Sequence, residues 1–310
     1  MAKPKILLIT DVWGWGGHHR GEQIVKYLSD EFELELITQA MLNKADHKYD
    51  LDDYDLYYPL FHVQLRLGKL HDRMDRVVTV VTGRTALKPK FAEYGQGNRK
   101  VGFLKFANQC RAIFANNYLA LRELRTYYNG TSIYVPRGVD EKLFSYEPYP
   151  STGFTACFVG KGRMPEKGYV SHIVPACVRT NTKMISNIKN YRNAVTQDLV
   201  KEQIYDRSHV LMVASTVDGT PNPALEAASC GRPILSNRIG NMPEFIEQGV
   251  NGFLVERNIE EYAEKLRWMK RNTAKCDKMG QRARQKIEKE WCWRETLNRY
   301  ERKALRSVLK

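Results

Sequence analysis

The stretch Ser215-Thr-Val-Asp-Gly-Thr-Pro-Asn-Pro-Ala-Leu-Glu-Ala-Ala-Ser-Cys-Gly-Arg-Pro-Ile-Leu-Ser236 says more about the fold than any other part of this chain. The apolar run before it, His209 to Ala214, predicts a strand that delivers Ser215 to a loop. A helix is expected to start near Pro221-Asn-Pro223, since proline is favoured in the first turn of a helix. The loop then lies against unpaired N–H groups at a helix start, which suits a phosphate without any metal.

Two acids in this stretch are spaced so that they can act together. Asp218 lies in the loop with Gly219, and Glu226 follows Asp218 by eight positions, about one turn inside the helix. Both carboxylates can then face one cleft and accept hydrogen bonds from sugar hydroxyls. The alternative is that Asp218 is a turn residue and Glu226 a solvated helix residue.

Short apolar runs separated by helical segments surround this stretch, a pattern typical of a parallel sheet covered on both faces. In the first half, strands are predicted at 5–10, 32–38, 56–61, 77–82, 112–115 and 132–135, and helices at 17–29 and 116–128. In the second half, strands are predicted at 154–159, 209–214, 233–236 and 252–255, and helices near 168–178, 195–207, 222–230, 242–248 and 259–272. The predicted fold class is α/β, with two Rossmann-like, doubly wound units facing a central cleft.

Composition and length agree with two globular domains. The chain has 310 residues and 43% hydrophobic residues, which excludes a disordered or fibrous protein. The proline-rich stretch 145–153 is predicted to be an interdomain linker. We therefore expect domains at 1–148 and 149–290, and a helix at 291–310 that packs back towards the first domain. The six cysteines lie far apart, which favours buried free thiols over disulfides or zinc.

The sequence predicts a cytoplasmic protein that touches a membrane at most from its surface. The apolar run at the N-terminus is too short for a signal peptide, and no window approaches 18 consecutive apolar residues. This predicted location includes the inner face of a membrane, or the cytoplasm of the host if a bacteriophage encodes the chain.

The formal net charge of +14 is distributed unevenly. Residues 30–55 hold nine acids against two lysines, residues 60–111 hold eleven Lys or Arg against three acids, and residues 277–310 hold eleven against five. Such basic blocks suit a polyanionic partner, either nucleic acid phosphates or an anionic membrane surface. The alternative is a basic surface that only keeps the protein soluble. No stable protein partner is expected.

The stretch 215–236, followed by Gly240-Asn-Met-Pro-Glu-Phe-Ile-Glu-Gln-Gly-Val-Asn-Gly-Phe-Leu-Val255, resembles the donor-binding segment of the family 4 retaining glycosyltransferases. Weaker similarity lies in Pro136-Arg-Gly-Val-Asp140 and in the Gly- and Lys-rich turn Val159 to Gly168. Trp293 resembles the aromatic residue of the family's closing helix. The resemblance implies the GT-B fold, with an N-terminal acceptor domain and a C-terminal domain that binds a nucleotide-sugar.

The resemblance also implies roles for single residues. Glu226 would hold the ribose of the donor, Asp218 with Gly219 and Thr220 would hold the sugar, and Lys167 with Lys161 or Arg163 would neutralise the diphosphate. Asp218, Glu226 and Lys167 are the implied catalytic residues, and no metal or other cofactor is expected beside the co-substrate, a UDP-sugar. The implied donor site comprises Gly16, Gly17, Lys161, Arg163, Lys167, Ser215, Asp218, Gly219, Thr220, Pro221 and Glu226.

The chain departs from the family at three places. Thr82 stands where the family has a histidine, and Lys161 stands where it has an arginine. Residues 180–208 look shorter than usual, as if a strand were missing.

Acceptor contacts are predicted in the first domain. His18, His19 and Arg20 follow a glycine-rich turn at the mouth of the cleft, where they could bind acceptor or, as histidines, act as a base; the alternative is a set of helix-start surface residues. Arg84, Lys88 and Lys90 follow the fourth strand. The Asp-x-Asp patterns at Asp50 to Asp55 are interpreted as part of an acidic run and not as a metal site.

The sequence therefore predicts a metal-independent, retaining glycosyltransferase with a polyanionic acceptor. The favoured acceptor is DNA that bears a hydroxymethylated pyrimidine, as in bacteriophages. The alternative acceptor is a lipid-linked or lipopolysaccharide glycan at a membrane surface. A further alternative is a non-catalytic protein of the same scaffold that binds sugar nucleotides or nucleic acid.

Overall fold

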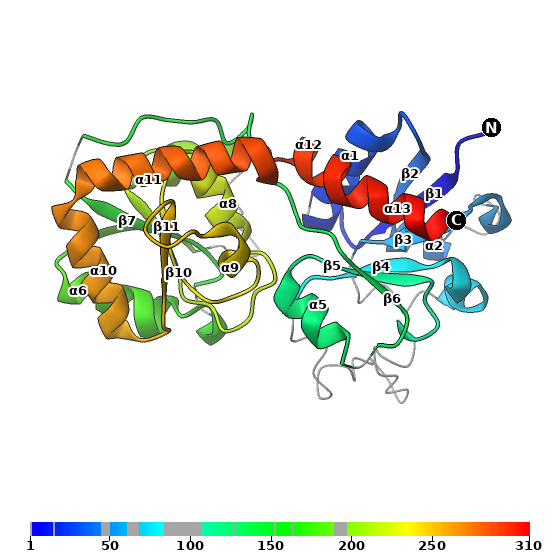
Figure 1. The fold of residues 1–310 in the computed structure, drawn as a ribbon, viewed down its shortest axis with the longest axis horizontal. Helices are drawn as coiled ribbons and strands as arrows, with labels where there is room; N and C mark the ends of the chain where they lie inside the picture. Colours follow the sequence, from blue (N-terminus) through cyan, green and yellow to red (C-terminus); the bar gives the residue numbers. More distant parts are fainter. Residues whose placement is uncertain are drawn as a thin grey trace. The chain divides into compact units, whose positions relative to one another are not determined.

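The computed structural model of the chain describes residues 2–14, 16–44, 50–60, 68–83, 107–126, 128–151, 153–162, 164–188 and 197–310. These residues form two compact units. Unit 1 comprises Met1–Pro136 together with Thr296–Lys310, and unit 2 comprises Arg137–Glu295. Both units are built from parallel strands with helices packed against them (Figure 1).

Unit 1 is organised around the first strand of the chain. Its strands are β1 (Lys5–Thr10), β2 (Glu33–Thr38), β3 (Leu56–Pro59), β4 (Val78–Val81), β5 (Ala112–Ala115) and β6 (Thr131–Tyr134). Strands β2 and β3 flank β1, and β5 lies between β4 and β6, with parallel pairing throughout these sets. A parallel bridge between Tyr57 and Val77 joins the two sets. Strands β1, β3, β4 and β5 are mostly apolar, as is typical of parallel strands covered on both faces.

The helices of unit 1 follow the strands in alternation. In the described part of residues 1–136 they are α1 (Gly16–Leu28), α2 (Gln39–Lys44) and α5 (Tyr118–Leu124), with 3₁₀ segments at Leu51–Asp53 and Gly68–Arg76. Helix α5 begins where the side chain of Asn117 accepts a hydrogen bond from the Ala120 amide at 2.7 Å. This cap satisfies one of the donors that a helix start leaves without a partner, which explains why the helix starts there.

The C-terminal segment belongs to unit 1. A short helix α12 (Trp293–Thr296) leads into a π-helical turn (Leu297–Glu301) and then α13 (Arg302–Leu309). Arg302, the first residue of α13, donates a hydrogen bond of 2.8 Å to the carbonyl of Tyr27 in the last turn of α1. Helix α13 buries an apolar stripe, Ala304, Leu305 and Val308. Burial of a leucine side chain of this kind stabilises a fold by roughly 1.5–3 kcal/mol.

Opposite charges also hold this segment in place. Arg302 forms ion pairs with Asp30 at 2.9 Å and with Glu31 at 2.8 Å, and Arg306 pairs with Glu31. The acidic run that begins at Asp30 and the basic C-terminus thus neutralise each other inside one unit. Part of the C-terminal basic block is therefore a structural feature and not a surface for a polyanion.

Unit 2 contains one parallel sheet of five strands. They are β7 (Thr155–Gly160), β8 (Lys183–Ile188), β9 (Val210–Val213), β10 (Ile234–Asn237) and β11 (Gly252–Val255). Their order across the sheet is β11-β10-β9-β7-β8. Successive side chains of β7 point to opposite faces, so Ala156 and Phe158 join one apolar cluster while Cys157 and Val159 join another.

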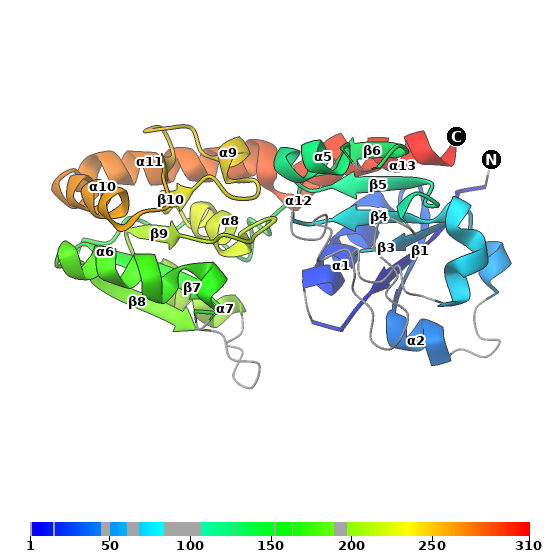
Figure 2. The same cartoon turned by 90° about the horizontal axis from the view of Figure 1, so that it is seen from below.

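Helices cover both faces of the sheet of unit 2 (Figure 2). The first cluster takes side chains from a π-helical turn (Tyr169–Ile173), α6 (Val174–Arg179) and α10 (Ile259–Arg271). The second takes them from a π-helical turn (Lys201–Tyr205), α8 (Asn222–Ser229) and α9 (Met242–Phe245). The remaining elements among the described residues are a 3₁₀ turn (Pro165–Lys167), α7 (Gln197–Val200), α11 (Thr273–Lys286) and a π-helical turn (Ile287–Trp291).

The segment 137–149, which overlaps the predicted linker 145–153, packs on unit 2. Val139 pairs with Cys292 in a parallel bridge, and Phe144 is buried in the core of unit 2. Tyr149 donates a hydrogen bond to the carbonyl of His209 at 2.8 Å. The change of unit in the structure falls after Pro136, whereas the sequence analysis placed it at 148. Proline and glycine between 145 and 153 mark an irregular but attached segment.

One strand was not anticipated. Strand β8 lies within 180–208, the range that looked short by a strand. It lies at one edge of the sheet, where it pairs with β7. Its described side chains are exposed or partly buried. An edge strand needs no continuous apolar run, so its sequence, Lys-Met-Ile-Ser-Asn-Ile, carries a weak signal.

Among the described residues, no helix is both long enough and apolar enough to cross a lipid bilayer.

Candidate donor site in unit 2

The order of strands in unit 2 marks one place where a ligand is expected. From β7 the chain moves outward to β8, and then returns to β9 on the other side of β7. Open parallel sheets bind ligands outside the carboxyl ends of the strands at this reversal. The two loops at this place are the turn that follows β7 at Gly160 and the loop that follows β9 at Val213.

The loop after β9 is fixed by hydrogen bonds from three neighbouring segments. The side-chain amide of Asn237 donates to the carbonyl of Ser215 at 2.9 Å, and the backbone amide of Thr216 donates to the carbonyl of Glu166 at 2.7 Å. The Asn241 amide donates to the carbonyl of Gly219 at 3.1 Å. The loop is therefore held in one conformation by β10, by the turn after β7 and by the segment before α9.

Glycine is required where these segments meet. Gly240 has a φ of 52° and Gly168 a φ of 65°, in the left-handed region that other residues rarely adopt. A Cβ at Gly240 would lie 2.7 Å from the carbonyl carbon of Gly219, and a Cβ at Gly168 would lie 2.9 Å from the Cβ of Ala214. The turn after β7, at Gly168, and the segment after β10, at Gly240, therefore both lie against the loop that follows β9.

Two of the predicted catalytic residues are in direct contact. The Nζ atom of Lys167 lies 2.6 Å from Oδ2 of Asp218, and the Ser215 hydroxyl donates to the same oxygen at 3.4 Å. Both charged side chains are partly exposed. Asp218 is therefore more than a turn residue, since its carboxylate pairs with a cation from the neighbouring loop, 51 positions away in the sequence.

Glu226 is buried within α8, with 9% of its surface exposed, which excludes the interpretation of a solvated helix residue. Its Oε2 atom accepts a hydrogen bond of 2.6 Å from the hydroxyl of Tyr205. Burial, and then the nearby carboxylate of Glu226, raise the pKa of Tyr205 well above its ordinary value. Tyr205 is therefore a stable donor that orients the carboxylate of Glu226.

The helix that carries Glu226 begins directly after the loop. The side chain of Pro221, which precedes α8, makes no capping hydrogen bond, and Thr220 lies just before it. Lys161 follows β7 and is partly buried. Arg163, which was predicted to share the diphosphate, lies outside the described residues.

Sequence reasoning missed two residues of this region. Tyr205 ends a π-helical turn, and its link to Glu226 has no sequence signature because 21 positions separate them. Asn241 is fully buried, and its side-chain amide makes no hydrogen bond within the part of the chain that the structure describes. Its place in the Gly-Asn-Met-Pro-Glu motif was the available signal.

In unit 1, the predicted residues lie at the end of β1. Gly16 is the first residue of α1, and a Cβ at Gly17 would lie 2.8 Å from the hydroxyl oxygen of Thr10. Gly17 thus lets the helix begin against the strand. His18 and His19 follow in the first turn of α1, and burial holds the pKa of His18 below its ordinary value.

Arg20 has a structural role, in contrast to the predicted contact with an acceptor. Only 2% of its surface is exposed, and its guanidinium forms hydrogen bonds with Glu301 at 2.7 Å and Tyr58 at 3.0 Å. Tyr58 in turn donates to Glu301 at 2.6 Å. This buried group ties α1 to the C-terminal segment of unit 1.

The basic block at 60–111 is only partly described. Arg84, Lys88 and Lys90, predicted to contact the acceptor, lie outside the described residues. Three described members have partners inside unit 1: Arg73 pairs with Asp52, Arg76 donates to the carbonyl of Tyr54, and Arg111 donates to the carbonyl of Val308. Asp50 and Asp55 also accept hydrogen bonds from backbone amides, which accounts for part of the acidic run.

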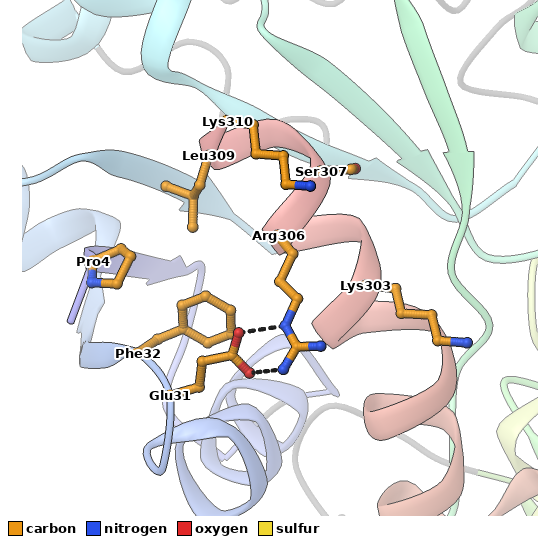
Figure 3. Close-up of a pocket in the computed structure, with 8 residues that line it drawn as sticks. All are labelled: Pro4, Glu31, Phe32, Lys303, Arg306, Ser307, Leu309 and Lys310. Carbon is orange, nitrogen blue, oxygen red and sulfur yellow. Dashed lines mark hydrogen bonds and ion pairs between the residues drawn. The ribbon is translucent and has the colours of Figure 1, made fainter. Parts of the chain in front are cut away.

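A surface hollow of about 390 Å³ lies elsewhere in unit 1 (Figure 3). It is lined by Pro4 and Phe32, which precede β1 and β2, and by Arg306 and Leu309 of α13. Glu31 and Arg306 are joined across it by two hydrogen bonds. The hollow lies at the amino ends of the strands, so it is separate from the edge where α1 begins.

Two units with parallel, Rossmann-like sheets define this protein as one with the GT-B fold. Residues 192–286, which include Asp218 and Glu226, match the model of the family described as glycosyl transferases group 1.

Curated relatives match parts of the chain. A spore coat protein SA from Bacillus subtilis is 31% identical over 70 residues, which cover 22% of this chain and 19% of that protein. An uncharacterized glycosyltransferase from Methanocaldococcus jannaschii is 26% identical over 177 residues, which cover 50% of this chain and 48% of that protein. The matches thus span less than half the length of these curated relatives.

Solved structures match nearly the whole chain. A sucrose-phosphate synthase from Thermosynechococcus elongatus has a TM-score of 0.78 at 14% identity, over 99% of both chains. The HepE protein of Anabaena, solved in complex with UDP-glucose, has a TM-score of 0.68 at 18% identity, over 98% of this chain and 99% of that one. At these identities the similarity establishes the fold.

Proposed function

We propose that this chain is a glycosyltransferase that moves a sugar from a nucleotide-sugar donor, a UDP-sugar, to a hydroxyl of a polyanionic acceptor. The observation that carries the proposal is the ion pair of 2.6 Å between Lys167 and Asp218. It joins two loops at the reversal of strand order in unit 2, where the fold binds ligands, and the helix that follows bears the buried Glu226. The family match at 192–286 and the UDP complexes of Anabaena HepE support the same activity.

Acidic and basic residues contact different parts of the donor. Glu226, held by Tyr205, accepts hydrogen bonds from the ribose hydroxyls, while Asp218 with Gly219 and Thr220 holds the sugar. Lys167 and Lys161, joined by Arg163, neutralise the diphosphate. On this proposal, Lys167 exchanges the carboxylate of Asp218 for phosphate oxygens when the donor binds, and Asp218 becomes available to sugar hydroxyls.

The chemical step follows from this arrangement. The bond between the anomeric carbon and the diphosphate oxygen breaks, the acceptor oxygen bonds to the same carbon, and the acceptor proton passes to the departing diphosphate. Lysines placed at the diphosphate stabilise the negative charge that develops there, a task that a divalent metal performs in other enzymes. We propose transfer with retention of configuration, which rests on the resemblance to family 4 enzymes.

For the acceptor we propose DNA with a hydroxymethylated pyrimidine. The support is the excess of cations in residues 60–111, eleven Lys or Arg against three acids. A lipid-linked or lipopolysaccharide glycan is the second candidate, favoured by the exposed apolar side chains of Val12 and Trp13 in the loop after β1. A cytoplasmic location fits either acceptor.

The experiment is a panel of nucleotide-sugars incubated with the purified protein in EDTA, with each acceptor in turn, and read as nucleotide release and as product. Glu226→Gln and Lys167→Met are expected to abolish transfer while the chain stays folded, as measured by circular dichroism. Glu264→Gln is the matched control, since Glu264 is an exposed glutamate on α10 of the same unit. Full activity of Glu226→Gln would overturn the donor site, and product without inversion of the anomeric centre supports retention.

The acceptor is tested separately. Replacement of Arg84, Lys88 and Lys90 together is expected to weaken transfer to DNA and to flatten its dependence on salt, with donor hydrolysis unchanged. Transfer only to the lipid-linked glycan would assign the basic residues to a membrane surface. Donor binding without turnover on any acceptor would favour a non-catalytic binding protein.

A further inference from the structure

Three potential metal ligands converge in the first turns of α1. One ring nitrogen of His18, one of His19 and a carboxylate oxygen of Glu22 all lie within 4.8 Å of one another. Oε2 of Glu22 is 3.1 Å from Nδ1 of His19 and 3.6 Å from Nδ1 of His18. The helix causes this convergence, because positions three and four apart lie on the same face.

The separations match those of ligands around one ion. Nitrogen and oxygen ligands lie about 2.0–2.2 Å from zinc in a tetrahedral site, which places the ligands roughly 3.4 Å from each other. Both distances to Glu22 lie close to this value. The side chain of His19 is 40% exposed, so rotation of its ring can bring its nitrogen nearer to that of His18.

The protein itself leaves one of these atoms unsatisfied. Nδ1 of His18 is buried, and among the described residues it makes no hydrogen bond. A buried polar atom of this kind is costly unless a proton donor or an ion serves it. Trp13 packs edge-on against the ring of His18, with centroids 4.1 Å apart, and limits its rotation.

We propose that His18, His19 and Glu22 form a binding site for a divalent transition metal, with Zn²⁺ as the best match. Two imidazoles and one carboxylate are a set of ligands that zinc accepts, and three protein ligands leave a fourth position for water or an oxygen of a ligand. The site lies at the carboxyl end of β1, which has β2 on one side and β3 on the other, so it stands at the reversal of strand order in unit 1. All three of its ligands belong to unit 1, whereas Lys167, Asp218 and Glu226 belong to unit 2.

The cysteine thiols of the chain do not compete for zinc in the folded protein. All six cysteines are buried. Burial raises the pKa of Cys110 and Cys157 to about 12 and that of Cys177 to about 11, so these thiols stay protonated at neutral pH. Zinc binding to the native protein therefore measures binding to histidines and carboxylates, and not to cysteines.

The test is calorimetric titration of the tag-free, chelator-treated full chain with Zn²⁺. The wild type is expected to bind one Zn²⁺ per chain. His18→Ala, His19→Ala and Glu22→Gln should each weaken binding by more than the roughly 10–100-fold that outer partners of a metal site contribute. His71→Ala should bind as the wild type does, because His71 is an exposed histidine beside Asp72 in the same unit.

A second measurement locates the ion without relying on the ligand variants. Co²⁺ quenches indole fluorescence at short range, so its titration should quench the fluorescence of Trp13, and Trp13→Phe should lose that part of the quenching. Wild-type protein that binds no Zn²⁺, or variants that bind it as tightly as the wild type, would overturn the proposal. Because donor turnover is measured in EDTA, failure of this site and failure of the donor site give different results.

Discussion

The buried ion pair between Arg20 and Glu301 permits a quantitative prediction. The side chains are 3% and 1% exposed, and both Arg20 and Tyr58 bond to the one carboxylate. Glu301→Gln removes the negative charge and leaves the buried guanidinium without a counter-charge. Breaking a buried pair in this way costs about 3–5 kcal/mol, because the remaining charge is desolvated and unpaired.

The expected loss is large enough to measure in the intact chain. For a unit of about 150 residues, each kcal/mol lowers the unfolding temperature by about 2–4 °C, so Glu301→Gln should lower it by roughly 6–20 °C. Differential scanning calorimetry of the variant and the wild type measures this change. Asp72→Asn, at an exposed ion pair of the same unit, should change the free energy of unfolding by no more than about 0.5 kcal/mol.

A double variant separates loss of the pair from loss of packing. Arg20→Met with Glu301→Leu removes both charges, and replacement of a buried pair by apolar residues is often close to neutral. We therefore expect the double variant to regain most of the stability that Glu301→Gln loses. If Glu301→Gln costs less than about 1 kcal/mol, as a surface pair would, the structural role of Arg20 is refuted and its predicted contact with the acceptor returns.

Three further predictions concern single positions. Tyr205→Phe should raise the KM for the donor about tenfold or more, with a small change in kcat. The variant removes a hydrogen bond to a charged group, worth about 1.5–3 kcal/mol. An unchanged KM would contradict the positioning of Glu226 by Tyr205. Gly240→Ala should lower the free energy of unfolding, measured in urea, by about 1–3 kcal/mol through strain at a φ of 52°. Gly153→Ala should leave it nearly unchanged, because the space around Gly153 is open. Equal effects of the two variants would contradict the close approach of Gly240 to Gly219. Hydrogen bonds from Arg306, with those from Arg302, hold the pKa of Glu31 below its ordinary value of 4.5, so its contribution is present above that pH and is lost as the pH falls through the folded-state pKa. The difference in unfolding temperature between wild type and Glu31→Gln should accordingly shrink below pH 4.5, and a constant difference would contradict the ion pair.

The buried strands could be predicted from the sequence because their signal is local. The runs at Lys5–Thr10, Ala112–Ala115 and Gly252–Val255 are strands with the predicted limits. The edge strand Lys183–Ile188 was missed, since an edge strand mixes polar and apolar residues. Residues 137–148 attach to unit 2 because Val139 and Phe144 pack in a core formed by residues far away in the sequence. Composition does not reveal such contacts.

For the candidate donor site, the sequence predicts residues but not their contacts. The resemblance selected Lys167, Asp218 and Glu226, while the ion pair and the hydrogen bond from Tyr205 depend on which strands are neighbours. Arg20 shows the opposite case. Its place in a motif favoured a surface role, and only the fold brings Glu301, 281 positions later, against it.

The central claim is that the edge of unit 2 at Lys167, Asp218 and Glu226 binds a nucleotide-sugar. A crystal structure of the protein with UDP tests it most directly. The account predicts ribose hydroxyls within hydrogen-bond distance of the carboxylate of Glu226, and Lys167 turned from Asp218 to the diphosphate. UDP bound elsewhere, with Lys167 still paired to Asp218, would contradict it.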